Sequence, residues 1–444
     1  MELFGLSIFS VISLATLSVV YFFLISEKLN KVIVSILGAT ILILMQVFRT
    51  ATNSSQKNAF EFIANNLDIL GFVIGMMVLV GIVKESGIFE ALAIWIVKLV
   101  KGHPVLLLIS LGYLTLFMTA LFSNIPTVLI IIPILVILIK TFKLPYLPYF
   151  FVTIMMSNIG GAMTPISDPT TYYQAKTVGL SFAEVVSNSG LIVMILSVVT
   201  LIYSIIIFKK DLSSVVVDKK SVEFFKPKAA IKNRKILYKG LPILIMVILI
   251  MIFKEQIHNL LDITIDNATI TIGGAFLAMM IFHRKPYKVF RELIDWEIIF
   301  FFMGLFIIVG SLEFTHVIEL LAAQLVKISG GNITYLTLMI SSGSAVISTF
   351  IDNVPYNITM VGAIKSMETA GITVYPLWWA LNLGTSIGGG GSPIAAACNV
   401  IAFGQAEKEG WKTSFFKYLG LAMPLVIINS LITFGIIWLR YIAG

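Results

Sequence analysis

Two acidic residues lie within otherwise apolar stretches of this sequence and are the first candidates for chemistry. Asp168 lies in the segment Thr-Pro-Ile-Ser-Asp-Pro at 164–169, and Asp352 begins the segment Asp-Asn-Val-Pro-Tyr at 352–356. A carboxylate inside a bilayer costs several kcal/mol unless it is paired, protonated or bound to a cation. Hard oxygen ligands suit Na⁺. We therefore expect Na⁺ or H⁺ at both residues; a helix cap near the membrane surface is the alternative.

Two glycine-rich segments interrupt other apolar stretches. Residues 158–165 read Asn-Ile-Gly-Gly-Ala-Met-Thr-Pro, and residues 386–393 read Ser-Ile-Gly-Gly-Gly-Gly-Ser-Pro. Within a helix glycine costs about 1 kcal/mol and proline about 3 kcal/mol, and unwound backbone at membrane depth survives only inside protein or beside a cavity. The freed carbonyls suit a cation and the freed N–H groups suit an anion. We predict a broken helix at each segment; packing glycines or a proline kink are the alternative.

These motifs recur in a nearly constant register, which indicates an internal duplication. The pairs, 228 or 229 residues apart, are Gly75 with Gly304, Gly81 with Gly310, residues 123–126 with 352–355, and residues 158–165 with 386–393. The duplication predicts two pseudo-symmetric polar sites.

Each predicted site combines a short polar turn with a glycine break. The first contains Ser123, Asn124, Asn158, Asp168 and the carbonyls near Gly160 and Gly161. The second contains Asp352, Asn353, Ser392 and the carbonyls of Gly388, Gly389, Gly390 and Gly391. The residues predicted to contact a solute between the sites are Asn124, Thr127, Thr164, Asn353, Ser392 and Asn399.

The composition indicates the kind of chain that must position these residues. Of the 444 residues 58% are apolar and 12% are charged, with a mean hydropathy of +0.99. An ordinary soluble domain is about one quarter charged, so we exclude a soluble domain, a disordered chain and a nucleic-acid-binding domain. The single cysteine, Cys398, excludes an intrachain disulfide and an all-thiolate metal site. The motif His-Glu-x-x-His is absent, and we expect no enzyme.

The apolar stretches predict an all-α polytopic membrane protein, because a span needs about 20 apolar residues. The stretches 105–139 and 333–364 are too long for one span, and each is either a bent span with a loop or a re-entrant hairpin. Two hairpins place most of the 31 Lys and Arg residues on one face, which the positive-inside rule assigns to the cytoplasm. This layout gives a multi-pass cell-membrane protein with its amino terminus outside.

The same layout gives two inverted repeats, each with a re-entrant hairpin and a broken transmembrane helix. The predicted parts are a first half at 1–208, a basic cytoplasmic linker at 209–239 and a second half at 240–444.

At these motifs the chain resembles the ion transporter superfamily. It is most similar to the branch with arsenite permeases, sodium/proton antiporters and the P protein, which shares a citrate-transporter-like domain. The motifs that carry the resemblance are 25–30 (Ile-Ser-Glu-Lys-Leu-Asn), 350–356 (Phe-Ile-Asp-Asn-Val-Pro-Tyr), 158–161 with 164–169, and 399–402 (Asn-Val-Ile-Ala).

The resemblance implies a scaffold and a mobile transport unit, with homodimers in some members. The ion or solute contacts that it implies are Asn124, Asn158, Asp168, Asp352, Asn353 and Ser392. There are three departures. Ser123 replaces an aspartate common in this branch, Thr171 replaces an amide, and Ile125 breaks the Ser-Asn-Thr turn of the dicarboxylate relatives.

These features favour a secondary active transporter of elevator type for a small anion or oxyacid, such as arsenite, coupled to H⁺ or Na⁺. A sodium/proton antiporter using Asp168 and Asp352, and a passive anion channel, are the alternatives. No Walker motif is present, so any ATPase would be a separate subunit. The expected partners are the lipid bilayer, a small solute or ion and a second copy of the chain, without nucleic acid; no cofactor beyond the coupling ion is expected.

Overall fold

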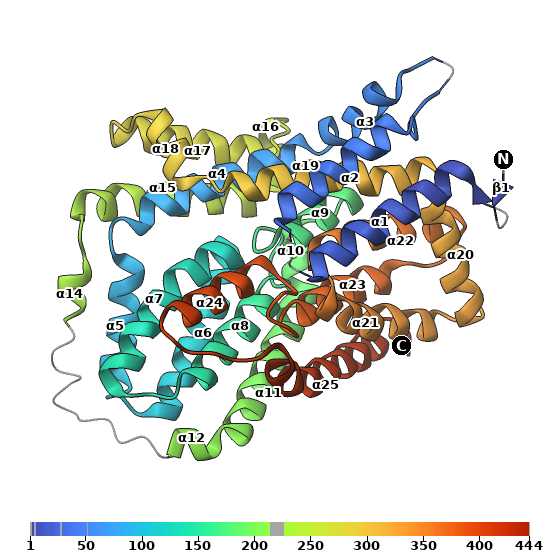
Figure 1. Ribbon diagram of the computed structural model, residues 1–444. Helices are drawn as coiled ribbons and strands as arrows, with labels where there is room; N and C mark the ends of the chain where they lie inside the picture. The colour runs from blue at the N-terminus through green and yellow to red at the C-terminus, as the bar shows by residue number, and fades with distance from the viewer. Residues whose placement is uncertain (1, 4–5, 27–28, 51, 214–225, 444) are drawn as a thin grey trace.

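The computed structural model describes residues 2–3, 6–26, 29–50, 52–213 and 226–443, and it is almost entirely helical (Figure 1). Helices make up 81% of the structure. Within the described residues the single sheet pairs β1 (Glu2–Leu3) with β2 (Leu6–Ser7). Among the described residues, eight helices are long and apolar enough to cross a membrane. The prediction of an all-α polytopic membrane protein is therefore confirmed.

The part of the chain up to residue 213 contains the predicted first half and the start of the basic linker. Its helices are α1 (Ile8–Ser26), α2 (Lys31–Leu44), α3 (Ser55–Ala64), α4 (Leu67–Lys84), α5 (Ile88–Leu99), α6 (Pro104–Phe122), α7 (Asn124–Phe142), α8 (Tyr146–Gly160), α9 (Pro169–Val178), α10 (Phe182–Val185), the π-helical turn η1 (Val186–Gly190), α11 (Leu191–Ile207) and α12 (Lys209–Ser213).

The part of the chain from residue 226 onward contains the end of the linker and the predicted second half. Its helices are α14 (Pro227–Ala230), α15 (Arg234–Ile252), α16 (Lys254–Leu261), α17 (Asn267–Ile281), α18 (Pro286–Leu293), α19 (Trp296–Phe314), α20 (Val317–Ser329), α21 (Ile333–Phe350), α22 (Asn353–Thr369), α23 (Tyr375–Gly389), α24 (Ala397–Lys408) and α25 (Phe415–Tyr441). Linker residues 214–225, and Glu27 and Lys28 of the motif at 25–30, lie outside the described residues.

The internal duplication extends to the helix boundaries. Each of the five helices from α4 to α8 begins 229 residues before its counterpart among α19 to α23. This register matches the spacing of the sequence motifs. It also includes α5 and α20, short helices that a search for long apolar runs does not find. The opposite orientation of the two halves in the membrane stays a prediction, as do their boundaries.

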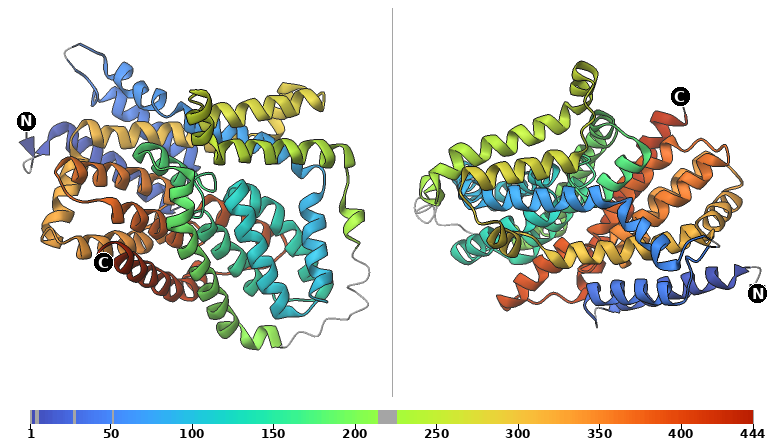
Figure 2. Two further views of the ribbon diagram at one scale, coloured as in Figure 1. Left: turned by 180° about the vertical axis from the view of Figure 1, so that it is seen from behind. Right: turned by 90° about the horizontal axis from the view of Figure 1, so that it is seen from above.

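The helices form two layers that cross one another. Figures 1 and 2 show α2, α4, α15, α17 and α19 in one layer over α6, α8, α21, α23 and α25 in the other. In the first layer α4 packs on α17, and α19 packs on α2. A Cβ atom at Gly75 would lie 2.7 Å from the backbone of Thr271, and one at Gly304 would lie 2.8 Å from the backbone of Ser35. The duplicated glycines thus allow two equivalent close helix crossings.

The two long apolar stretches form helical hairpins. Helix α6 ends at Phe122 and α7 begins at Asn124, with Ser123 alone between them at a φ of 76°. Helix α21 ends at Phe350, and α22 begins at Asn353 directly after its cap Asp352. The helices of each pair pack on one another, so neither stretch is one bent span. We call residues 123–126 the first tip and 352–355 the second tip.

Both glycine-rich segments interrupt a helix, as the sequence indicates. Helix α8 ends at Gly160 and α9 begins at Pro169; helix α23 ends at Gly389 and α24 begins at Ala397. We call the non-helical residues 161–168 the first break and 390–396 the second break. These breaks supply the unwound backbone that the prediction requires.

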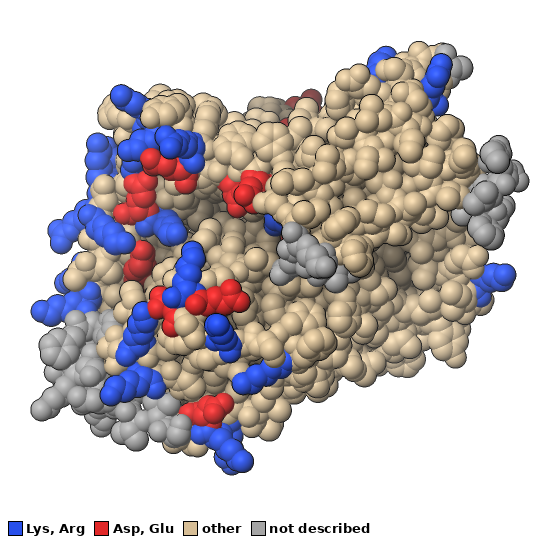
Figure 3. All heavy atoms as spheres, viewed as in Figure 1, with Lys and Arg blue, Asp and Glu red and all other residues tan. Residues whose placement is uncertain are grey.

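Charged side chains gather toward one end of the elongated molecule. Figure 3 shows most of the visible Lys, Arg, Asp and Glu residues on the side of α5, α14 and α15, and a few at the opposite end. A broad uncharged surface separates the two groups on this face. Such a belt between polar ends is typical of a protein that spans a bilayer.

Candidate functional site

A small central cavity lies where the two tips meet the first break. Its volume is about 50 Å³, which has room for on the order of four water molecules. Its apolar walls come largely from α4 and α19. The predicted site residues that line it are Ser123, Asn124, Asp168, Asp352 and Asn353. Residues from both halves and from three separate elements therefore meet in one place.

Asp168 is held by neutral donors from several elements. It is 2% exposed and caps the N-terminus of α9. Asn124 of the first tip donates to its Oδ2 atom at 2.6 Å. The backbone N–H and hydroxyl of Thr170 donate to Oδ1 at 2.9 and 2.8 Å, and Asn353 of the second tip is a further hydrogen-bond partner. Asp168 thus joins both tips to the first break.

Asp352 has fewer protein partners. Its side chain is half-buried and caps α22 by accepting a hydrogen bond from the backbone N–H of Val354 at 3.1 Å. The structure gives its side chain no other hydrogen bond among the described residues. Of the two carboxylates, Asp352 therefore has more acceptor capacity for an ion or solute.

Equivalent hydrogen bonds shape the two breaks. Thr171 donates to the Gly161 carbonyl at 2.7 Å, and Asn399 donates to the Gly389 carbonyl at 2.6 Å. The members of these pairs correspond in the repeat register. The amide of Asn399 also donates to the Ser392 carbonyl at 2.8 Å. Asn399 therefore closes the second break rather than facing the central cavity.

A second equivalent pair ties each break to its own hairpin. The hydroxyl of Thr164 donates to the Ala120 carbonyl, and the hydroxyl of Ser392 donates to the Thr349 carbonyl, both at 2.6 Å. Thr127, another predicted solute contact, donates to the Ser123 carbonyl at 2.8 Å. None of these three side chains lines the central cavity. They hold the backbone that surrounds it.

Each half donates a hydrogen bond from an amide side chain to the broken-helix region of the other half. Asn158 of α8 donates to the side-chain oxygen of Asn399 at 2.9 Å, whereas the sequence groups it with Asp168. Asn382 of α23 donates to the Ala162 carbonyl in the first break at 3.2 Å. A Cβ atom at Gly389 would lie 2.6 Å from the Asn158 side-chain oxygen, so this glycine makes room for the contact. Sequence reasoning missed Asn382, although it is an amide inside an apolar stretch.

Several glycine carbonyls predicted as ion ligands already accept hydrogen bonds. The Gly160 and Gly388 carbonyls accept bonds from backbone N–H groups, and the Gly390 carbonyl accepts one from the Tyr418 hydroxyl at 3.0 Å. Among the described residues no three His, Cys, Asp or Glu side chains gather as metal ligands. A Na⁺ ion would therefore have to use Asp168 or Asp352 with tip amides and backbone.

Sequence reasoning also missed Lys31, which was not among the predicted site residues. Lys31 is the first residue of α2 and lines the central cavity. Its ammonium lies 5.2 Å from the ring centroid of Phe301 on α19. The available signal was its place directly before the apolar run 32–48.

A larger cavity, which we call the vestibule, opens beside the central one. Its volume is about 420 Å³, and Asp295 and Glu297 line its outer part. The residues that line both cavities are Lys31, Ile298, Asp352 and Ala397. The central cavity therefore adjoins a wider space between α19 and α24.

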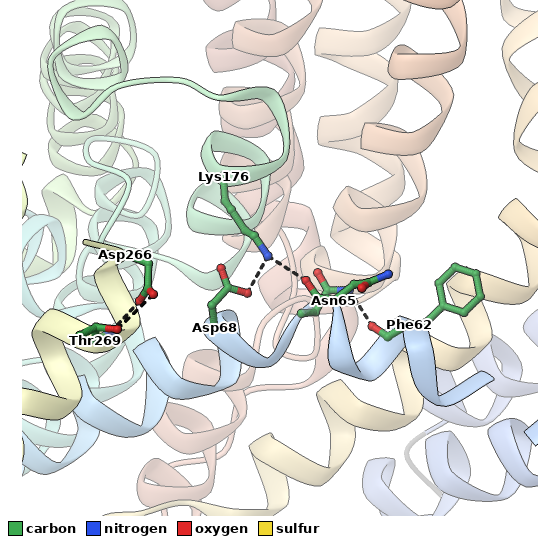
Figure 4. Close-up of polar contacts among 7 residues, drawn as sticks. Phe62, Asn65, Asp68, Lys176, Asp266 and Thr269 are labelled. Carbon is green, nitrogen blue, oxygen red and sulfur yellow. Dashed lines mark hydrogen bonds and ion pairs between the residues drawn. The ribbon is translucent and has the colours of Figure 1, made fainter. Parts of the chain in front are cut away.

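The corresponding region of the first half is closed. The ammonium of Lys176 on α9 lies 2.6 Å from the Asp68 carboxylate on α4 and donates to the Asn65 carbonyl at 2.9 Å (Figure 4). The rings of Phe72 and Tyr172 stack nearby with centroids 4.3 Å apart. The cavity of about 210 Å³ beside this contact shares no lining residue with the central cavity.

Comparison with known proteins confirms the resemblance predicted from the motifs. The family described as "Citrate transporter" matches residues 21–384. An uncharacterized transporter of Mycobacterium tuberculosis is 28% identical over 441 residues, which cover 97% of this chain and 99% of that protein. A 46 kDa membrane protein of Mycobacterium leprae is 28% identical over 98% of this chain and 99% of its own length. The P protein of Mus musculus is 23% identical over 95% of this chain and 59% of its own length.

Proposed function

Because the chain belongs to the citrate transporter family, we propose that it is a secondary active transporter of a small anion or oxyacid, coupled to H⁺ or Na⁺. It works in the cell membrane by alternating access of elevator type, with the amino terminus outside and the basic linker cytoplasmic. The broken helices and tips form the mobile unit, and the crossed helices α2, α4, α17 and α19 form the scaffold. The family is one of transporters rather than enzymes.

One observation carries the proposal: two carboxylates and two tips share a central cavity that adjoins a wider space beside α19 and α24, whereas an ion pair closes the corresponding interface of α4 and α9. Alternating access requires a site that faces one side of the membrane at a time. The vestibule supplies the open side, and the contact between Lys176 and Asp68 supports a closed opposite side. A passive channel needs no such closure.

In this proposal Asp352 and Asp168 bind the coupling ion, and the tip amides bind the solute. Carboxylate, amide and backbone oxygens are suitable ligands for Na⁺, and each carboxylate can instead take up a proton. Asn124 and Asn353 lie in the cavity with both carboxylates. Binding of an ion at Asp352 or Asp168 would therefore change the charge that the solute meets.

A sodium/proton antiporter is the second candidate, and the size of the cavity favours it. A cavity of about 50 Å³ accommodates a small ion with a few water molecules in this conformation. In that case Asp168 and Asp352 would exchange Na⁺ for H⁺ without another solute.

Flux measurements in proteoliposomes separate these functions. The purified protein is tested with citrate, phosphate, arsenite and antimonite under an imposed pH or Na⁺ gradient. Accumulation of one solute against its own gradient supports the transporter and excludes a channel. Sodium-dependent proton movement with none of these solutes present would support the antiporter instead of the solute transporter. If only downhill flux is observed, a passive channel is the remaining function.

A further inference from the structure

Lys31 presents a positive charge to the central cavity and to the vestibule. Its side chain is half-buried and lines both spaces. No described carboxylate lies within 4.0 Å of its ammonium, since the ion pairs of the described residues do not include it. No other Lys or Arg lines either space among the described residues. Among the described residues, therefore, no carboxylate neutralises this ammonium in a close ion pair.

The acidic groups that face Lys31 come from three directions. Asp352 of α22 is near enough to interact with it electrostatically. Asp295 and Glu297 line the vestibule, and Glu297 accepts a hydrogen bond from Asn30 at 3.3 Å. Asp168 of the first break lines the same central cavity and is held by the tip amides. Lys31 thus lies beside the predicted ion-binding carboxylates without being paired to them.

We propose that Lys31 is the residue that makes the site select an anionic solute over a neutral one. The assignment rests on the proposed transport function and names the charge of its substrate. When coupling cations neutralise Asp168 and Asp352, the cavity retains one positive charge, that of the Lys31 ammonium. A bound anion cancels that charge, whereas a neutral acid does not.

Two local features favour this role. The Phe301 ring holds the ammonium by a cation–π contact, which positions the charge without neutralising it. Lys31 is also the first residue of α2, where the partial positive charge of the helix N-terminus favours an anion. The amides of Asn124 and Asn353 lie in the same cavity and can donate hydrogen bonds to the anion.

The test compares Lys31→Gln and Lys31→Arg with the matched control Lys57→Gln. Lys57 is an exposed residue of α3 whose ammonium donates to Asn53. Initial uptake rates into proteoliposomes are measured for citrate and phosphate as anions and for arsenous acid as a neutral solute. Thermal unfolding with and without Na⁺ reports whether the ion site survives in each variant.

We expect Lys31→Gln to raise the KM of a transported anion by about tenfold or more, the effect of losing about 1.4 kcal/mol of binding. Its maximal rate and its Na⁺-induced stabilisation should stay near those of the wild type. Lys31→Arg should restore the KM to within about threefold, and Lys57→Gln should match the wild type.

The possible contradictions differ for the two proposals. Uptake of arsenous acid alone, equally fast in Lys31→Gln, would overturn the role of Lys31 while the transport function stands. A loss of maximal rate with an unchanged KM would also overturn it, because that result indicates a structural role. If the wild-type protein neither binds nor accumulates any solute, the transport function fails, and the assignment of Lys31 fails with it.

Discussion

Two interfaces at equivalent positions of the repeat differ in this structure. Helix α9 is fastened to α4, whereas the vestibule separates α24 from α19. In the repeat register Asp68 and Phe72 correspond to Glu297 and Phe301, so the scaffold side of both interfaces is chemically alike. The helices that face them differ. Tyr172 and Lys176 of α9 correspond to Val400 and Gly404 of α24.

The difference indicates that the asymmetry of the two interfaces originates in the different sequences of α9 and α24. At these two positions α24 has neither an aromatic ring nor a cation, and in the open interface Lys31 lies over Phe301 instead. The closed interface is also weak enough to open. A partly exposed ion pair contributes about 0–1 kcal/mol, and a stacked aromatic pair contributes about 0.5–1.5 kcal/mol. Under the proposed alternating access, the two states can exchange at that cost.

The largest expected effect comes from the carboxylate on the open side. Asp352→Asn removes the charge that we propose binds the coupling ion, while an amide of similar size preserves the helix cap. We expect uphill solute accumulation to fall below detection, with normal expression and thermal unfolding. Glu255→Gln, at an exposed acidic residue of α16, is the control and should transport normally. Unimpaired accumulation by Asp352→Asn would falsify its role in coupling.

A smaller effect tests whether the two glycine crossings of the scaffold are equivalent. The two interfaces described above are not equivalent. Gly75→Ala and Gly304→Ala each place a Cβ atom within 3 Å of a neighbouring helix backbone. We expect each to lower the free energy of unfolding by about 1–3 kcal/mol, seen as similar decreases in the thermal midpoint. Gly273→Ala, with no atom within 4 Å of its added Cβ, should leave it nearly unchanged. Very different effects of the two crossing glycines would argue against equivalent crossings.

The smallest effect concerns the closed interface itself. Lys176→Met removes the ion pair with Asp68 and should favour opening by up to about 1 kcal/mol, or up to about fivefold in population. Ser123→Cys supplies a thiol in the central cavity for a membrane-impermeant reagent added on the Lys176 side. We expect faster labelling in the double variant than with Ser123→Cys alone or with Lys57→Met added. Equal rates would mean that the stacked rings, rather than the ion pair, keep this interface closed.

The features that sequence reasoning predicts here are local in origin. Glycine and proline weaken a helix wherever they occur, so the breaks and tips follow from composition, and the repeat register follows from spacing. The position of Lys31 over Phe301 depends on how α2 packs against α19, and no local pattern encodes that contact. Asn158 illustrates the same limit. Its own break suggests the first site, but packing between the halves directs its amide to Asn399.

The exchanged amides of Asn158 and Asn382 also constrain how the chain is assembled. Among the described residues, the side chain that donates to the Ala162 carbonyl of the first break comes from α23, which the ribosome makes more than 200 residues later. Before then that carbonyl must remain hydrated or bind another group, because an unmet polar group in lipid costs several kcal/mol. We therefore expect the amino-terminal half to insert early but to complete its polar interior only when the carboxy-terminal half arrives.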